Sequence, residues 1–189
     1  MYTVKTTIEG VSPILFNRFT EEAQNQVESG RSTGRQTMVQ KRDEAQNRKV
    51  YKNTDGLFCP SPCVKKAVIL ACSIAGLKRQ KKGLGQILKA VMFLEPVEIP
   101  FGVKEPDYVD EQSGRIPPRT GARVMLYRPA LKEGWRLTFT IRVFDDLIPA
   151  DQIRRALEDA GIYQGLCDGR PEYGRFEVKE FEASKPAKK

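Results

Sequence analysis

The segment at residues 165–178, GLCDGRPEYGRFEV, places three glycines and two arginines just before an alternating, strand-like pattern. Glycine tolerates positive φ and lets backbone N–H groups approach a phosphate, and arginine presents a planar fork of donors to the same group. The pattern therefore predicts an anion-binding loop in which Gly169, Arg170, Gly174 and Arg175 hold phosphate. The same residues also suit a tight helix-to-strand connection whose glycines form turns and whose arginines face water.

The overall charge favours a polyanionic partner. The 189 residues include 32 Lys and Arg against 24 Asp and Glu, a net charge of +8 at pH 7. Such an excess is typical of proteins that bind nucleic acid. The chain contains no histidine, which excludes Ser-His-Asp and Cys-His catalysis and histidine-ligated zinc. Lys, Tyr, Cys and carboxylates remain for catalysis. We expect a protein that is not an enzyme and needs no cofactor.

Cysteines are the remaining candidate metal ligands. Cys59 and Cys63 lie in CPSPC, but the second pair of a zinc ribbon is missing, because Cys72 falls within a helical pattern and Cys167 is isolated. We predict no metal site and expect buried or free thiols in a reducing compartment, with a structural zinc as the alternative. No apolar run approaches the ~20 residues of a membrane span, and the first residues alternate instead of forming a leader. The sequence thus predicts a cytoplasmic protein without a membrane partner.

Four segments show the periodicity of strands. Residues 2–9 and 135–144 alternate cleanly between apolar and polar side chains, and residues 174–182 follow the glycine-rich segment with a similar pattern. The apolar, β-branched run at residues 86–101 is expected to be a strand that bends at Pro96. These four strands are separated by two segments with helical periodicity.

The first helix is predicted over residues 61–82, with Ser61 as its N-cap and basic residues at its end. The second is predicted to start near Pro149 and to stop at Gly161. The resulting order, β-α-β-β-α-β, predicts an α+β fold with both helices on one face of an antiparallel four-stranded sheet. This is the ferredoxin-like, or RNA-recognition-motif-like, sandwich, with the first and third strands at the centre.

The outward face of those central strands is expected to be polar and basic. It would lack the aromatic residues on which RNA-recognition motifs stack bases, so we expect nucleic acid to bind mainly elsewhere. Polar segments at about residues 20–53 and 102–133 are expected to be large irregular insertions in a single domain of residues 1–183, although residues 38–51 could form a short exposed helix. A disordered basic tail is predicted at residues 184–189.

The glycine-rich segment, between the second helix and the last strand, resembles the RAMP superfamily, the repeat-associated RNA-binding proteins of CRISPR systems. The matching residues are Gly165, Gly169, Arg170, Tyr173, Gly174, Arg175, Phe176 and Val178. The architecture is most similar to a small backbone subunit of an effector complex, or to a phage or mobile-element relative. The resemblance implies contact with guide RNA and assembly along the strand, with copies of the same chain or with other effector subunits.

Three further segments contribute basic residues. Residues 78–82, KRQKK, suit a solvated helix end or a phosphate track. Residues 115–129 combine arginines with Met125 and Tyr127, which suits single-stranded nucleic acid or a plain surface hairpin. The first insertion resembles the thumb of a backbone subunit in position, and a flexible loop is the alternative. The predicted contacts in these segments are Lys81, Lys82, Arg119, Arg123, Arg128, Arg31, Arg35, Lys41 and Arg42.

An acidic segment interrupts the basic sequence at residues 95–111, where six carboxylates accompany only Lys104. On a basic protein such a patch favours head-to-tail contacts with a neighbour and hence filaments. An acidic connection that prevents edge pairing is the alternative.

The sequence therefore predicts a non-catalytic protein that binds RNA or single-stranded DNA through its phosphates and forms a homo-oligomer along it. One alternative is a metal-independent endoribonuclease that processes guide precursors, in which Tyr163 or Tyr173 acts with Lys81 or Arg175. The other alternative is a protein-only assembly module of a phage or mobile element.

Overall fold

The computed structural model describes residues 1–19, 38–79, 82–115 and 123–184. Its main sheet has four antiparallel strands in the order β11-β1-β10-β6. The strands are β1 (Tyr2–Gly10), β6 (Met92–Glu95), β10 (Arg136–Val143) and β11 (Phe176–Ser184). The α+β class is confirmed, and β1 and β10 occupy the centre of the sheet as predicted.

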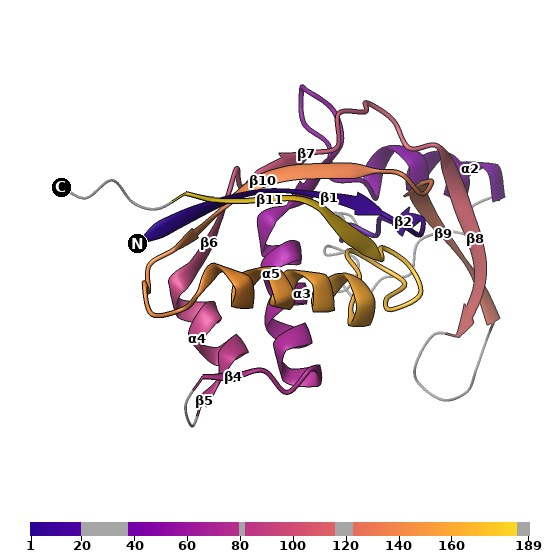
Figure 1. Ribbon diagram of the computed structural model, residues 1–189. Coiled ribbons are helices and arrows are strands. Elements are labelled where there is room, and N and C mark those ends of the chain that lie inside the picture. The colour runs from indigo at the N-terminus through magenta and orange to yellow at the C-terminus, as the bar shows by residue number, and fades with distance from the viewer. Residues whose placement is uncertain (20–37, 80–81, 116–122, 185–189) are drawn as a thin grey trace, which may run out of the picture.

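Three helices pack on one face of this sheet (Figure 1): α3 (Ser61–Ile74), α4 (Leu84–Val91) and α5 (Ala150–Tyr163). The alternation of β10 places Leu137, Phe139, Ile141 and Val143 in the core between sheet and helices. α5 buries its apolar stripe against the same core, as its helical spacing predicts. Within the described residues, no helix is both long and apolar enough to cross a bilayer.

A second, smaller sheet stands at one end of the main sheet (Figure 1). It has the order β2-β9-β8, from β2 (Ile14–Leu15), β8 (Tyr108–Arg115) and β9 (Arg123–Leu131), and α2 (Met38–Arg48) lies against it. The expectation of an irregular second insertion is therefore wrong for β8 and β9, which form an antiparallel hairpin. The short helix allowed in the first insertion is present, and residues 20–37 lie outside the described residues.

Two short antiparallel pairs complete the fold. β3 (Phe58–Pro60) pairs with β7 (Glu98–Pro100), and β4 (Lys78–Arg79) pairs with β5 (Lys82–Gly83). The bend predicted at Pro96 thus corresponds to the connection between β6 and β7. The proposed domain limit at residue 183 stays a prediction.

The predicted strand at residues 86–101 is wrong in its first part, because α4 continues to Val91. Leu84 and Leu88, four residues apart, are buried on one side of this helix. Gly85 allows the close contact with α3, since a Cβ there would lie 2.6 Å from the carbonyl oxygen of Ile69. A short apolar run does not distinguish a buried helix from a buried strand by its pattern alone.

The predicted helical position of KRQKK is also wrong. α3 ends at Ile74, and Gly76 adopts a φ of 64°, the left-handed conformation that terminates helices. The N–H of Leu77 donates to the carbonyl of Cys72 at 2.9 Å and closes this end. Lys78 and Arg79 belong to β4, and Lys82 belongs to β5. The N-terminal cap of α3 is Pro60, so Ser61 is its first helical residue rather than the cap.

Gly161 does not stop the second helix but lies within α5 and is buried. A Cβ at this position would lie 2.0 Å from the carbonyl oxygen of Phe176, so glycine is needed for the packing of α5 on β11. The helix ends at Tyr163 and is followed by Gly165, whose φ is 69° and whose N–H donates to the carbonyl of Ala160 at 2.9 Å. The glycine-rich loop begins at this residue.

Candidate nucleic-acid interface

The glycine-rich loop, residues 165–175, connects α5 to β11 and is hydrogen-bonded to the segment around β2. The N–H of Asp168 donates to the carbonyl of Leu15 at 3.0 Å, and the N–H of Gly174 donates to that of Pro13 at 2.8 Å. Within the loop, the N–H of Leu166 donates to the carbonyl of Gly174 at 2.9 Å. These bonds hold the loop in one conformation against the second sheet.

The glycines of this loop adopt backbone conformations that other residues disfavour. Gly165, Gly169 and Gly174 have φ values of 69°, 71° and 72°. A Cβ on Gly174 would lie 2.2 Å from the carbonyl oxygen of Leu166, and one on Gly169 would lie 2.7 Å from the ring of Tyr173. The N–H groups of Gly165 and Gly174 already donate within the chain, so they are not free to donate to a phosphate. Contact of these two residues with nucleic acid stays a prediction. Both are turn residues.

The segment Gly169–Arg170 keeps the properties expected of an anion site. No hydrogen bond within the described residues uses the N–H of either residue. The side chains of Arg170 and Arg175 are exposed, and neither forms an ion pair with another described residue. Arg175 donates from Nε to the carbonyl of Pro171 at 2.7 Å, which orients its guanidinium on the loop. Two unneutralised cations and two unused donors therefore lie close together in sequence.

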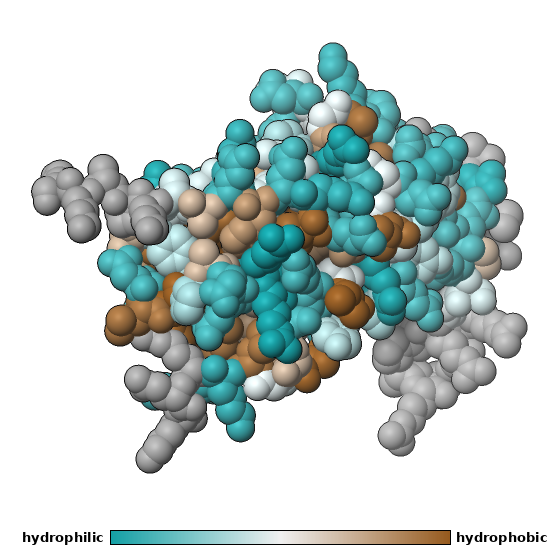
Figure 2. Space-filling view, in the orientation of Figure 1, coloured by the Kyte–Doolittle hydropathy of each residue, from teal (hydrophilic) through white to brown (hydrophobic). Residues whose placement is uncertain are grey.

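An open groove of about 660 Å³ lies beside this segment. Its walls come from the end of α3, the end of α5, β9 and the glycine-rich loop; they include Leu70, Ile74, Tyr163, Gln164 and Arg170. Ile74 and Tyr163 are 56% and 46% exposed, so an apolar wall and an aromatic ring face solvent next to a guanidinium. Figure 2 shows that hydrophobic surface gathers mainly over the helical layer, whereas the surface around the second sheet is mostly hydrophilic.

Arg128 is part of the internal structure of this site. Its side chain is 15% exposed and forms an ion pair with Asp168, and its Nη1 donates to Oε1 of Gln112 at 3.2 Å. Contact of Arg128 with nucleic acid stays a prediction, and it would involve a side chain already paired within the chain. Its charge instead neutralises Asp168, which would otherwise repel a phosphate at the neighbouring Arg170.

The tyrosines predicted near the site are also internal. Tyr127 is 3% exposed, so it is not available for stacking as expected, whereas Met125 is 41% exposed. Tyr173 is half-buried, packs on Gly169 and accepts a hydrogen bond from Nε2 of Gln112 at 2.7 Å. Tyr163, which the sequence suggested only for catalysis, is the aromatic side chain that lines the groove.

The other predicted contacts do not gather at this loop among the described residues. Lys82 lies on β5, well separated from the glycine-rich loop (Figure 1), and Arg42 pairs with Glu111 of β8. Arg123 lies on β9 and Lys41 on α2, but their side chains lie outside the described parts. Arg31, Arg35, Lys81 and Arg119 lie wholly outside the described residues.

The outer face of the main sheet is less basic than expected. Carboxylates from β1, β6 and β11 lie beside the cations. Arg136 pairs with Glu9, and Lys179 pairs with both Glu9 and Glu177. At the other end of the sheet Arg142 pairs with Glu95 at 3.0 Å. Ion pairs thus balance the charge of this face, which gives it little attraction for a polyanion.

Intramolecular partners engage most of the acidic segment at residues 95–111. Besides the pairs of Glu95 and Glu111, Glu105 pairs with Lys52, Glu98 accepts from Asn53 at 2.7 Å, and Asp107 accepts from the N–H of Lys132 at 2.8 Å. These contacts stabilise the chain's own loops and leave less negative charge for a neighbour. Head-to-tail assembly through this segment stays a prediction.

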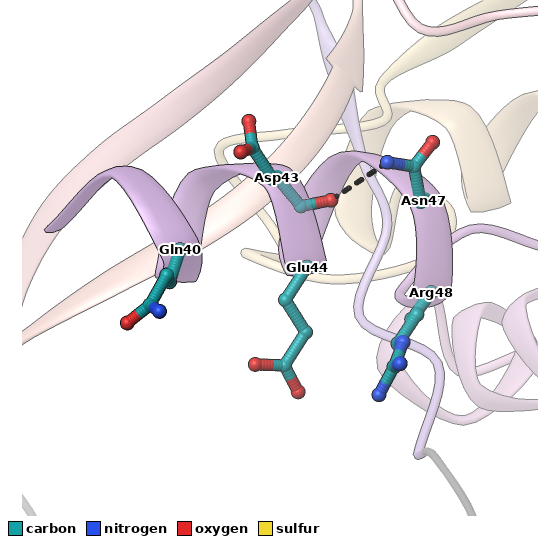
Figure 3. Close-up of a pocket in the computed structure, with 5 residues that line it drawn as sticks. All are labelled: Gln40, Asp43, Glu44, Asn47 and Arg48. Carbon is teal, nitrogen blue, oxygen red and sulfur yellow. Dashed lines mark hydrogen bonds between the residues drawn. The ribbon is translucent and has the colours of Figure 1, made fainter. Parts of the chain in front are cut away.

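A second hollow, of about 400 Å³, lies along α2 (Figure 3). Gln40, Glu44 and Arg48 extend from one side of the helix, and Asn47 donates to the carbonyl of Asp43 at 3.0 Å. Two carboxylates and one guanidinium give this surface no preference for an anion. The groove beside Arg170 is therefore the better candidate interface.

No known family model matches the chain, and no curated protein matches its sequence. Among solved structures, it is similar to a chain in the cryo-EM structure of the Type III-B Cmr-beta bound to cognate target RNA. The TM-score is 0.63 at 12% sequence identity, and the match covers 98% of this chain. The matched region is 61% of the other chain's length. At this identity the likeness shows a shared fold.

Proposed function

We propose that the protein is a non-catalytic, RAMP-like protein that binds single-stranded RNA through its phosphates. One observation carries the proposal: Arg170 is exposed at the edge of the groove, without an ion-pair partner among the described residues, next to unused N–H groups. A guanidinium and backbone donors converging on one point are suited to a phosphate. Arg175 adds a second exposed cation on the same loop.

The fold supports RNA as the partner. The strand order β11-β1-β10-β6, with α3 and α5 on one face, supports the ferredoxin-like arrangement that the resemblance to the RAMP superfamily implies. The similar chain comes from a complex described as bound to target RNA. We infer that this chain uses the related fold for the same kind of ligand, and that its assembly partners are other subunits or copies of itself.

The groove suggests how a nucleotide would lie. A phosphate at Arg170 would leave the adjoining base near the exposed ring of Tyr163, and stacking on an aromatic ring suits any base. Asp168 lies on the same wall, but its ion pair with Arg128 neutralises it. Binding would therefore be governed by phosphates and stacking, with little dependence on sequence.

A salt titration tests this function. The affinity for a short, labelled single-stranded RNA, measured by fluorescence anisotropy, is expected to fall with salt at a log–log slope of about −0.7 for each phosphate neutralised. The RNA should be recovered intact from the same samples, because the proposed site has no catalytic role. Binding that ignores ionic strength would contradict phosphate recognition, and cleaved RNA would contradict a non-catalytic role.

A further inference from the structure

Three of the four cysteines, from three separate segments of the chain, cluster at the glycine-rich loop. Cys59 lies in β3, Cys63 in the first turn of α3, and Cys167 in the loop itself. Each of these thiols affects the pKa of the other two, which places the three side by side, and all three are free. The Cys59 thiol also donates to the carbonyl of Pro60 at 3.8 Å. Cys59 is fully buried, whereas Cys63 and Cys167 are partly exposed. No sequence motif linked Cys167 to the CPSPC pair.

The surroundings of Cys63 stabilise a thiolate. It is the third residue of the 14-residue helix α3, where the helix dipole favours negative charge. Hydrogen bonds with Cys167 and Cys59 lower the pKa of Cys63, and the charges of Arg170 and Lys66 lower it further. In the same cluster, hydrogen bonds to Cys167 and Cys63, with burial, raise the pKa of Cys59.

Cys167 is the better placed of the two neighbouring thiols to react with Cys63. The hydrogen bond with Cys59 lowers the pKa of Cys167, but the bond to Cys63 and burial outweigh it and keep this thiol protonated. Cys167 lies in a loop, has a φ of 59° and is partly exposed. Cys59, in contrast, is buried in β3, which pairs with β7. Cys72, by contrast, is buried in α3, and burial raises its pKa to about 11.

We propose that Cys63 and Cys167 form a reversible, peroxide-sensitive thiol pair. The Cys63 thiolate attacks one oxygen of hydrogen peroxide, the O–O bond breaks, and hydroxide leaves and takes a proton to become water. Cys63 is thereby oxidised to a sulfenic acid. The Cys167 sulfur then attacks the Cys63 sulfur, the S–O bond breaks, and a second water leaves. Two thiols are oxidised to a disulfide as one peroxide is reduced to two waters.

Within the described parts of the chain, no group of three or more Cys, Asp or Glu side chains is arranged to hold a metal ion. The proposed bond would join the first turn of α3 to the loop three residues before Arg170. The proposed disulfide needs no RNA, so the inference stands whether or not the protein binds RNA.

Peptide mapping without reductant tests the pair. After treatment with hydrogen peroxide, mass spectrometry of the whole chain should show a Cys63–Cys167 disulfide that dithiothreitol reverses. Cys167→Ser should instead accumulate a sulfenic acid on Cys63 that dimedone traps, and Cys72→Ser, the matched control, should behave as the unmodified chain. At mildly acidic pH, iodoacetamide should alkylate Cys63 at least about tenfold faster than Cys72.

Three results would overturn the proposal: no disulfide after peroxide treatment, a Cys59–Cys63 disulfide in its place, or purified protein that carries zinc on these thiols. If a serine variant fails to fold, the peptide map and the alkylation rates of the unmodified chain still test the proposed disulfide, because these two measurements need no substitution. Loss of RNA binding would not affect this readout.

Discussion

Arg170→Ala is expected to weaken the binding of single-stranded RNA at least about tenfold, because a charge-assisted contact with phosphate contributes about 1.5–3 kcal/mol. Arg170 is exposed at the groove and forms no ion pair within the described residues, so its removal should cost little folding free energy. Arg170→Lys should bind with intermediate affinity, since it keeps the charge but loses the planar fork. Fluorescence anisotropy with a short, labelled RNA measures all three proteins.

Arg142→Ala provides the matched control. It removes the same charge, but Arg142 lies on the outer face of the main sheet and pairs with Glu95. Its affinity should stay within about twofold of the unmodified chain, because only the long-range charge changes. Equal losses for Arg142→Ala and Arg170→Ala would show that net charge, and not the groove, governs binding. Circular dichroism should confirm that both variants are folded.

Gly174→Ala is expected to destabilise the fold by about 3 kcal/mol or more. The residue has a φ of 72°, and a Cβ would lie 2.2 Å from the carbonyl oxygen and 2.6 Å from the nitrogen of Leu166. Neither backbone atom can move away freely, because the N–H of Leu166 donates to Gly174 itself. Urea unfolding followed by circular dichroism measures the loss.

Gly76→Ala separates backbone strain from the clash. Gly76 also has a positive φ, 64°, but nothing lies within 4 Å of the position that a Cβ would occupy. It should therefore lose only about 1 kcal/mol, the cost of the left-handed conformation. Equal losses of folding free energy for the two alanine variants would mean that the close packing of Gly174 against Leu166 contributes nothing to the effect of Gly174→Ala.

Local patterns predicted the elements whose burial alternates regularly. β10 and α5 each have one buried face, so their periodicity was sufficient to predict the type of each element. The central positions of β1 and β10 followed from the order of elements. α4 and the β4–β5 pair were predicted wrongly, because their conformations depend on contacts with α3 and on the helix end at Gly76. Such contacts leave no periodic signal in a short segment.

The candidate site was predicted only in part. The exposed arginines of the glycine-rich loop could be found from the sequence, because glycine and arginine types alone suggest an anion site. The ion-pair partner of Arg128 could not be found from the sequence, because Asp168 approaches Arg128 only when β9 packs against the loop. The same holds for Tyr163 in the groove and for the meeting of Cys63 with Cys167, which come from segments far apart in the chain.

Photo-crosslinking tests the central claim most directly. Single-stranded RNA that carries 4-thiouridine would be irradiated with the full chain, and the modified peptides would be located by mass spectrometry. We expect crosslinks in the glycine-rich loop around Arg170 and at Tyr163, lost when excess unlabelled RNA competes. Crosslinks confined to the outer face of the main sheet, or RNA that leaves this loop unmodified, would contradict the proposed interface.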